Sequence, residues 1–137
     1  MRYSCILIVL FYALPFFAQE IVSEAITINN GAISLPGTLS YPRVKERLPL
    51  VIFIHGSGNI DRNGNQAGLN IKANYIKMLS DSLNGRGIAF FRYDKRTSNP
   101  ENNKNMLKTI VYEDLADDAK QVIRYFKDDK RFRKIIL

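Results

Sequence analysis

Short apolar runs alternate with helical patterns beyond the first third of the chain, and this order most constrains the fold. Leu50–Ile54 and Ile88–Phe91 are continuous apolar runs, typical of strands buried on both faces. A third apolar run begins at residues 134–137. Between these runs, apolar side chains recur with helical spacing over residues 71–83 and 111–126. Strands that alternate with helices predict a parallel sheet connected by right-handed crossovers.

The two helical segments are expected to pack on the sheet through their apolar stripes. The first stripe comprises Tyr75, Met78, Leu79 and Leu83, and the second comprises Val111, Leu115, Ala119, Val122 and Phe126. Gly85 follows the first segment, where it is expected to form a left-handed C-cap.

A β-hairpin is expected ahead of these elements. Residues 21–28 and 32–41 alternate loosely between apolar and polar side chains, and Asn29-Asn30-Gly31 between them accepts the positive φ angles of a tight turn. A parallel sheet needs helices on both faces, and only two helical segments occur in the 137 residues. The sequence therefore predicts one α/β domain, residues 19–137, with an incomplete architecture.

The first 18 residues differ in kind from the rest of the chain. Arg2 precedes an apolar run over residues 5–17, and a small residue follows it, which predicts a secretory signal peptide over residues 1–18. The alternative is a membrane anchor, but the run is shorter than the roughly 20 residues of a spanning helix and contains Pro15. We expect a secreted or periplasmic protein with no stable membrane anchor. Because Cys5 leaves with the signal, no disulfide is expected.

Charge and motifs exclude several functional classes. The net charge is +7, but the bases of the second helical segment are interleaved with acids, as on a solvated face, so no nucleic-acid partner is expected. No phosphate-binding glycine motif occurs, and no cofactor is predicted. Asp61, Asn63 and Asn65 have the first spacings of a calcium loop. Gln66 and Lys72 replace its glycine and bidentate glutamate, so no metal is predicted.

A glycine-rich turn, His55-Gly56-Ser57-Gly58, directly follows the first apolar strand. Open α/β sheets bind their ligands at the carboxyl ends of parallel strands. Glycines at such a position let a substrate approach backbone N–H groups closely. The turn is therefore the first candidate for a binding site.

At this turn the sequence resembles the α/β-hydrolase fold family, in particular its bacterial esterase and serine-peptidase-like members. The resemblance also includes Asp61-Arg62-Asn63-Gly64-Asn65, the segment Gly87–Arg96 and Asp117-Asp118, and it covers about residues 35–137. It implies that the turn supplies one N–H group of an oxyanion hole.

The family resemblance implies a role for each residue of the turn. The oxyanion donor should be the backbone N–H of Ser57 or Gly58, with Gly56 permitting the turn and His55 as a structural residue. Two alternatives involve side chains. His55, the only histidine, could be a triad base, although it precedes the oxyanion turn. Ser57 could be a nucleophile, but Gly-x-Ser-x-Gly requires glycine at the positions of His55 and Asn59.

The charged run after the second apolar strand is assigned a structural role. Asp94 is expected to form a loop-fixing ion pair with Arg92 and Arg96 rather than to act as a catalytic acid. Thr97 departs from the family pattern, which has glycine after this run.

No catalytic residue is expected within this chain, because the resemblance implies that nucleophile, acid and base lie downstream. Residues 134–137 are expected to lead into the nucleophile turn, with one or two apolar residues and then Gly-His-Ser-x-Gly or a close variant. The implied function is an exported serine hydrolase acting on a small-molecule ester or a peptide. Residues 19–137 would be its N-terminal segment, truncated before the nucleophile elbow and inactive alone. The alternative is a non-catalytic exported α/β binding or interaction module.

Overall fold

The computed structural model describes residues 19–66, 68–70, 72–106 and 110–137. The predicted signal peptide, residues 1–18, lies outside the described residues and stays a prediction. None of the helices in the described part of the chain is long and apolar enough to cross a membrane.

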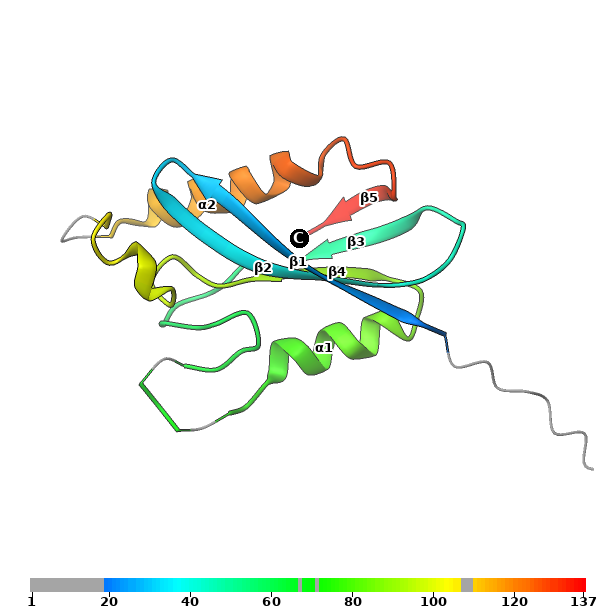
Figure 1. Ribbon diagram of the computed structural model, residues 1–137, viewed down its shortest axis with the longest axis horizontal. Helices are drawn as coiled ribbons and strands as arrows, with labels where there is room; N and C mark the ends of the chain where they lie inside the picture. The colour runs from blue at the N-terminus through cyan, green and yellow to red at the C-terminus, as the bar shows by residue number, and fades with distance from the viewer. Residues whose placement is uncertain (1–18, 67, 71, 107–109) are drawn as a thin grey trace, which may run out of the picture.

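Five strands form one mixed sheet in the order β1-β2-β4-β3-β5 (Figure 1). The strands are β1 (Ile21–Asn30), β2 (Ile33–Pro42), β3 (Leu48–Ile52), β4 (Ala89–Tyr93) and β5 (Phe132–Ile136). β2 is antiparallel to both β1 and β4, whereas β3 is parallel to both β4 and β5. The predicted α/β class, a hairpin followed by parallel strands that alternate with helices, is therefore confirmed. β4 joins the hairpin to the parallel part of the sheet.

The hairpin turn is one residue shorter and lies further along the chain than expected. Asn29 and Asn30 remain paired with Ser34 and Ile33, which leaves two residues, Gly31 and Ala32, to make the connection. Gly31 has a φ of 59°, as glycine has at the first central position of a type II′ turn. Gly31 therefore has the positive φ, which was expected somewhere in Asn29-Asn30-Gly31.

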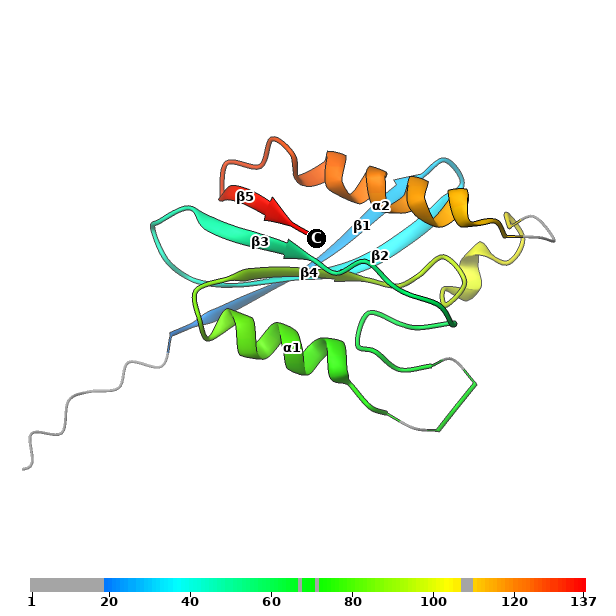
Figure 2. The same cartoon turned by 180° about the vertical axis from the view of Figure 1, so that it is seen from behind.

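One helix covers each face of the sheet (Figures 1 and 2). The helix α1 (Tyr75–Asn84) packs against β4 and β2, and α2 (Tyr112–Phe126) contacts β1 on the other face. A short 3₁₀ helix, η1 (Pro100–Asn102), lies in the connection between β4 and α2. Right-handed crossovers that run in opposite directions along a sheet place their helices on opposite faces, which explains this arrangement.

The predicted apolar stripe of α1 is wrong. The buried side chains are Ile76, Ser80 and Asn84, whereas Tyr75 and Met78 are exposed. Ser80 and Asn84 can be buried because they form hydrogen bonds with β2 and with the residue that precedes β4. The hydroxyls of Ser80 and Ser40 lie 2.8 Å apart, and the Asn84 Nδ2 donates to the carbonyls of Ser40 and Ile88.

The C-cap of α1 also differs from its prediction. Gly85 remains right-handed, with a φ of −62°, and Gly87 is the residue with a positive φ, 78°. The N–H of Ile88 donates to the carbonyl of Leu83, and that of Gly87 donates to Asn84. These two bonds form a Schellman motif with Gly87 at the left-handed position, two residues later than expected.

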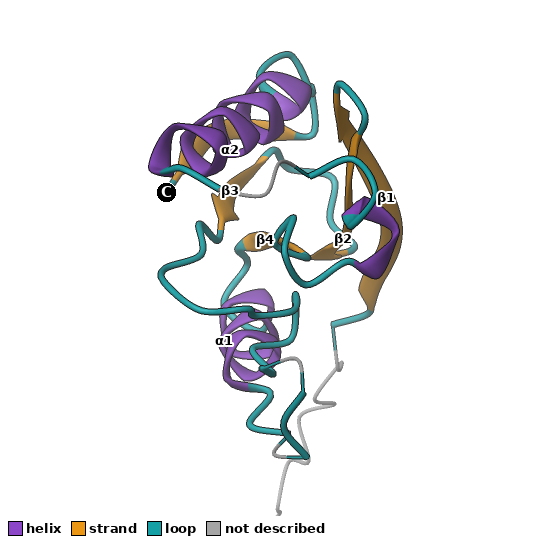
Figure 3. Cartoon of the chain, turned by 90° about the vertical axis from the view of Figure 1, so that its left-hand side faces the viewer, coloured by secondary structure: helices purple, strands orange, loops and turns teal. Residues whose placement is uncertain are grey.

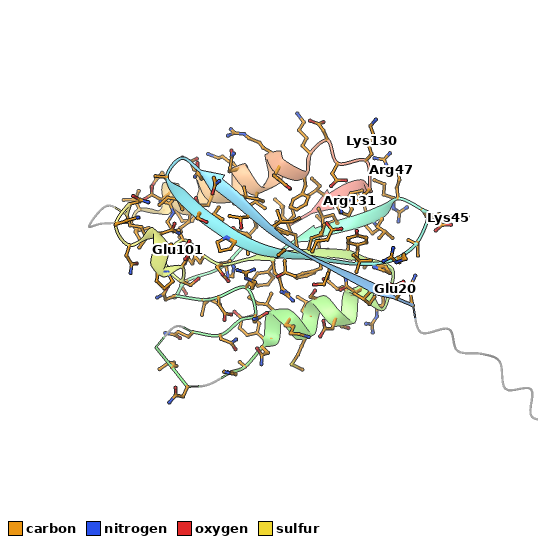
Figure 4. All side chains as sticks on the ribbon, viewed as in Figure 1. Glu20, Lys45, Arg47, Glu101, Lys130 and Arg131 are labelled. Carbon is orange, nitrogen blue, oxygen red and sulfur yellow. The ribbon has the colours of Figure 1, made fainter. Side chains whose placement is uncertain are left out.

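The main apolar core lies between the sheet and α2. Phe91 is fully buried there, and its ring centroid lies 4.7 Å from that of Phe126. Gly37 on the neighbouring strand makes room for Phe91, because a Cβ at that position would come within 2.4 Å of the Phe91 ring. Arg131 (labelled in Figure 4) ties the connection before β5 to the hairpin, where it pairs with Glu24. The core thus fixes the positions of β3, β4 and β5 relative to one another.

Candidate functional site at the carboxyl end of β3

The candidate turn lies where the strand order reverses. From β3 the chain passes through α1 to β4 on one side, and then through α2 to β5 on the other side of β3. Open α/β sheets have a ligand-binding crevice at such a switch point, outside the carboxyl ends of the strands. Figure 3 views the molecule from this end, where the loops after β3 and β4 lie between α2 and α1.

His55 connects the end of β3 to the end of β4. Its Nε2 donates to the carbonyl of Tyr93, and its ring makes edge contacts with Phe53 and Tyr93 at centroid distances of 5.5 and 5.2 Å. Burial lowers the pKa of His55, opposed by the bond to Tyr93, and the positive charge of Lys95 lowers it further. The imidazole is therefore neutral at pH 7, with its Nε2 proton committed to a backbone carbonyl.

The turn itself is exposed at Gly56, Ser57 and Gly58. Gly58 has a φ of 89°, a conformation that favours glycine, whereas the φ of Gly56 lies outside the left-handed region. A Cβ at Gly56 would meet no heavy atom of a described residue within 4 Å. The left-handed residue of the turn is thus Gly58 rather than Gly56, and the role of Gly56 stays a prediction.

Lys95 holds the turn from the loop that follows β4. Its Nζ donates to the carbonyls of Gly56 at 2.8 Å and Gly58 at 3.0 Å. Lys95 is only 7% exposed, and burial lowers its pKa. Lys95 was not expected from the sequence to belong to the site. A signal was present, since Lys95 follows a strand expected to lie in the same parallel sheet as the one before the glycine turn.

The ion pairs of the charged run differ from those expected. Asp94 binds Arg62, whose backbone N–H and side-chain Nε and Nη2 donate to its carboxylate at 2.8, 3.0 and 2.6 Å. Arg96 binds Asp118 of α2 at 2.7 Å and 2.8 Å. Asp94 thus has the predicted ion-pairing role, but its expected partners, Arg92 and Arg96, are wrong. An ion pair between residues far apart in sequence leaves no local pattern from which to identify it.

A cavity of about 590 Å³ adjoins the turn. Its lining includes Ser57, Lys95 and Leu137, together with the first half of the α2 stripe. Only the second half of that stripe, Val122 and Phe126, is fully buried against the sheet. The apolar residues of the first half, such as Leu115, instead line the cavity, which gives it mostly apolar walls.

The described residues of the site form no nucleophile and base pair. Ser57 makes no side-chain hydrogen bond to His55 or Lys95, whose donors are directed at backbone carbonyls. Within the described ranges, no group of three or more His, Cys, Asp or Glu side chains could hold a metal ion. Asp61 accepts hydrogen bonds from the N–H groups of Asn63 and Asn65, so the calcium-like spacing serves to close this loop. The chemistry this turn offers is backbone hydrogen-bond donation.

The chain is similar to Esterase EstD of Thermotoga maritima, with 28% identity over 127 residues. It is a distant relative of an esterase. The similar region covers 90% of this chain but only 28% of the esterase, so the chain spans about a quarter of its relative. No family model matches the chain. This weak homology confirms the resemblance to the α/β-hydrolase fold family, whereas the oxyanion roles of Ser57 and Gly58 stay predictions.

Proposed function

We propose that this chain forms the oxyanion-binding part of an exported serine hydrolase that acts on an ester or on an amide or peptide bond. The observation that carries the proposal is the position of Leu137. Leu137 follows β5, and Ser57 follows β3, yet both line one cavity. Because β3 and β5 are parallel neighbours, a nucleophile turn following β5 would start beside the glycine turn.

In this reaction a serine from that nucleophile turn attacks the substrate carbonyl, and the carbonyl oxygen becomes negatively charged. The N–H of Ser57 or Gly58 donates to this oxygen, and a second donor is the N–H after the nucleophile. Each donor contributes roughly 3 to 4 kcal/mol in a well-studied protease. The proposal places the base and the acid in the sequence downstream; His55 does not suit the role of base, because its Nε2 donates to the Tyr93 carbonyl.

Joining the chain to the protein sequence encoded downstream tests the hydrolase proposal. We expect hydrolysis of p-nitrophenyl acetate or butyrate that is lost when the serine of a downstream Gly-x-Ser-x-Gly is changed to alanine. Ser57→Ala is the matched control and should retain activity, because it keeps the backbone N–H. The 137-residue chain should have no activity above a His55→Ala control. Absence of Gly-x-Ser-x-Gly within about ten codons would contradict the proposal and favour the binding module.

Export is proposed on the composition of residues 1–18. The mature protein from its host should begin near Gln19, as determined by N-terminal sequencing. A mature protein that retains Met1 would show that export by a cleaved signal is wrong.

A further inference from the structure

The two hydrogen bonds from Lys95 restrict which N–H groups of the turn can face a ligand. In a planar trans peptide the carbonyl and the next N–H point in opposite directions, and no cis peptide occurs among the described residues. The carbonyl of Gly56 faces Lys95, so the N–H of Ser57 points away from Lys95. The N–H of Gly58 belongs to the peptide of the Ser57 carbonyl, to which Lys95 does not bond.

Lys95 is itself held on both sides. Asp94 is fixed by Arg62 and by its backbone N–H, which donates to the Pro36 carbonyl at 2.8 Å. On the other side, the Arg96 guanidinium is buried with Asp118 of α2. A lysine between two anchored neighbours has little freedom to move, so it can hold the exposed turn in one orientation.

We infer that Lys95 is a positioning residue that fixes the Ser57 N–H, rather than the Gly58 N–H, as the oxyanion donor; this inference rests on the proposed function. The ammonium acts through the Gly56–Ser57 peptide and does not touch the substrate. A cation at the carbonyl oxygen of that peptide also polarises it, which makes its N–H a stronger donor. Lys95 therefore both orients and strengthens the donor.

Amide dynamics in the full chain test the positioning directly. In Lys95→Met, the Ser57 amide order parameter should fall from about 0.85, typical of rigid backbone, to below about 0.6. Lys120→Met is the matched control, because Lys120 lines the same cavity but is exposed and bonds to Asp117. That variant should leave the Ser57 amide rigid, and Lys95→Arg should partly restore the rigidity. A rigid Ser57 amide in Lys95→Met would overturn the inference.

A second measurement needs no substitution and covers the case in which Lys95→Met does not fold. The Lys95 ammonium protons in the unmodified chain should exchange with water more slowly than those of the exposed Lys120, because Lys95 is buried and bonded to two carbonyls. Equal exchange rates for the two ammonium groups would overturn the inference.

Kinetics of the extended protein separate the inference from the proposed function. Lys95→Met should lower kcat by about 10-fold to 100-fold per folded molecule, while KM changes less than about twofold, because a misplaced donor affects mainly the transition state. An unchanged kcat would overturn the role of Lys95 as a positioning residue. An extended wild-type protein without hydrolase activity would overturn the proposed function, and the amide measurement would then decide whether Lys95 holds the turn.

Discussion

Two neighbouring loops at the carboxyl edge of the sheet are built in opposite ways. In the turn after β3, residues 56–58 are exposed, and the carbonyls of Gly56 and Gly58 accept hydrogen bonds from Lys95. In the run after β4, each of three consecutive charged side chains binds a different part of the molecule. Asp94 binds Arg62, Lys95 binds the turn and Arg96 binds α2.

Under the proposed function, the backbone that would bind a substrate is separate from the side chains that hold it in place. An N–H group that donates to a substrate oxygen must be accessible, and it cannot also donate to an acceptor inside the protein. Buried, hydrogen-bonded charges have few alternative arrangements, so they suit the supporting role.

The largest effect is expected for the ion pair that anchors the charged run to α2. Asp118 and Arg96 are 2% and 7% exposed, so Asp118→Ala leaves a buried guanidinium without its main partner. We expect a loss of about 3 to 5 kcal/mol in the free energy of unfolding, measured by urea denaturation. Asp117→Ala is the matched control, since Asp117 is exposed, and its stability should not change measurably. Equal losses in both variants would contradict the importance assigned to the buried ion pair.

Within the glycine turn, the two glycines should differ in their tolerance of a side chain. Gly58→Ala forces a Cβ into a φ of 89° and should cost about 1 to 2 kcal/mol of stability. Gly56→Ala adds a methyl group in open space at a φ outside the left-handed region and should change stability by less than about 0.5 kcal/mol. Urea denaturation of both variants measures the difference. The reverse order would indicate that Gly56 is the residue that permits the turn.

The order of elements and the glycine turn could be predicted from the sequence because both have a local signature. Continuous apolar runs predicted β3 and β4 to within two residues at each end, and glycines after a strand located the turn. The face of α1 could not be predicted in this way. Its buried Ser80 and Asn84 are polar, and only their partners on β2 and beside β4 make burial favourable.

The supporting part of the site was missed for a related reason. Asp94 and Arg62 are 32 residues apart in sequence, and Lys95 lies 39 residues from Gly56. Pairing between charged residues depends on which loops the fold brings together, and a run of three charges predicts equally well a local cluster or three separate contacts. The sequence therefore located the glycine turn, whose donors the family resemblance implies, but not the residues that hold it.

A smaller effect distinguishes the observed partner of Asp94 from the expected one. The Asp94–Arg62 pair is partly exposed, with side-chain exposures of 19% and 24%, so a double-mutant cycle to alanine should give a coupling of about 1 kcal/mol. The same cycle between Asp94 and Arg92 should give a coupling near zero, because no hydrogen bond joins them among the described residues. A larger coupling to Arg92 would contradict the structure of this loop.

The smallest effect concerns pH and the histidine beside the turn. Burial lowers the pKa of His55 in the folded protein below its ordinary value of 6.5. Between these two pKa values the unfolded chain binds the proton more readily, so the free energy of unfolding should fall as the pH falls below about 6.5. Because His55 is the only histidine, the loss between pH 7 and pH 5.5 should be assignable to it. The loss is expected to stay below about 1 kcal/mol, since even a tenfold difference in proton affinity between the folded and unfolded chains corresponds to roughly 1.4 kcal/mol.

His55→Gln is the control that separates titration from packing. A glutamine amide can donate a hydrogen bond to the Tyr93 carbonyl as His55 does, but it takes up no proton in this range. Urea denaturation at several pH values between 7 and 5.5 should show a free energy of unfolding that falls with pH in the wild-type chain and changes less in the variant.

If the free energy of unfolding changes equally with pH in both proteins, groups elsewhere cause the pH dependence. If wild-type stability rises as the pH falls, His55 is stabilised as a cation, and the attraction of Asp94 and Asp61 outweighs the effect of burial on its pKa. In that case His55 would belong with the charged supporting run rather than with the neutral, backbone-directed turn, and the contrast between the two loops would be weaker than their geometry indicates.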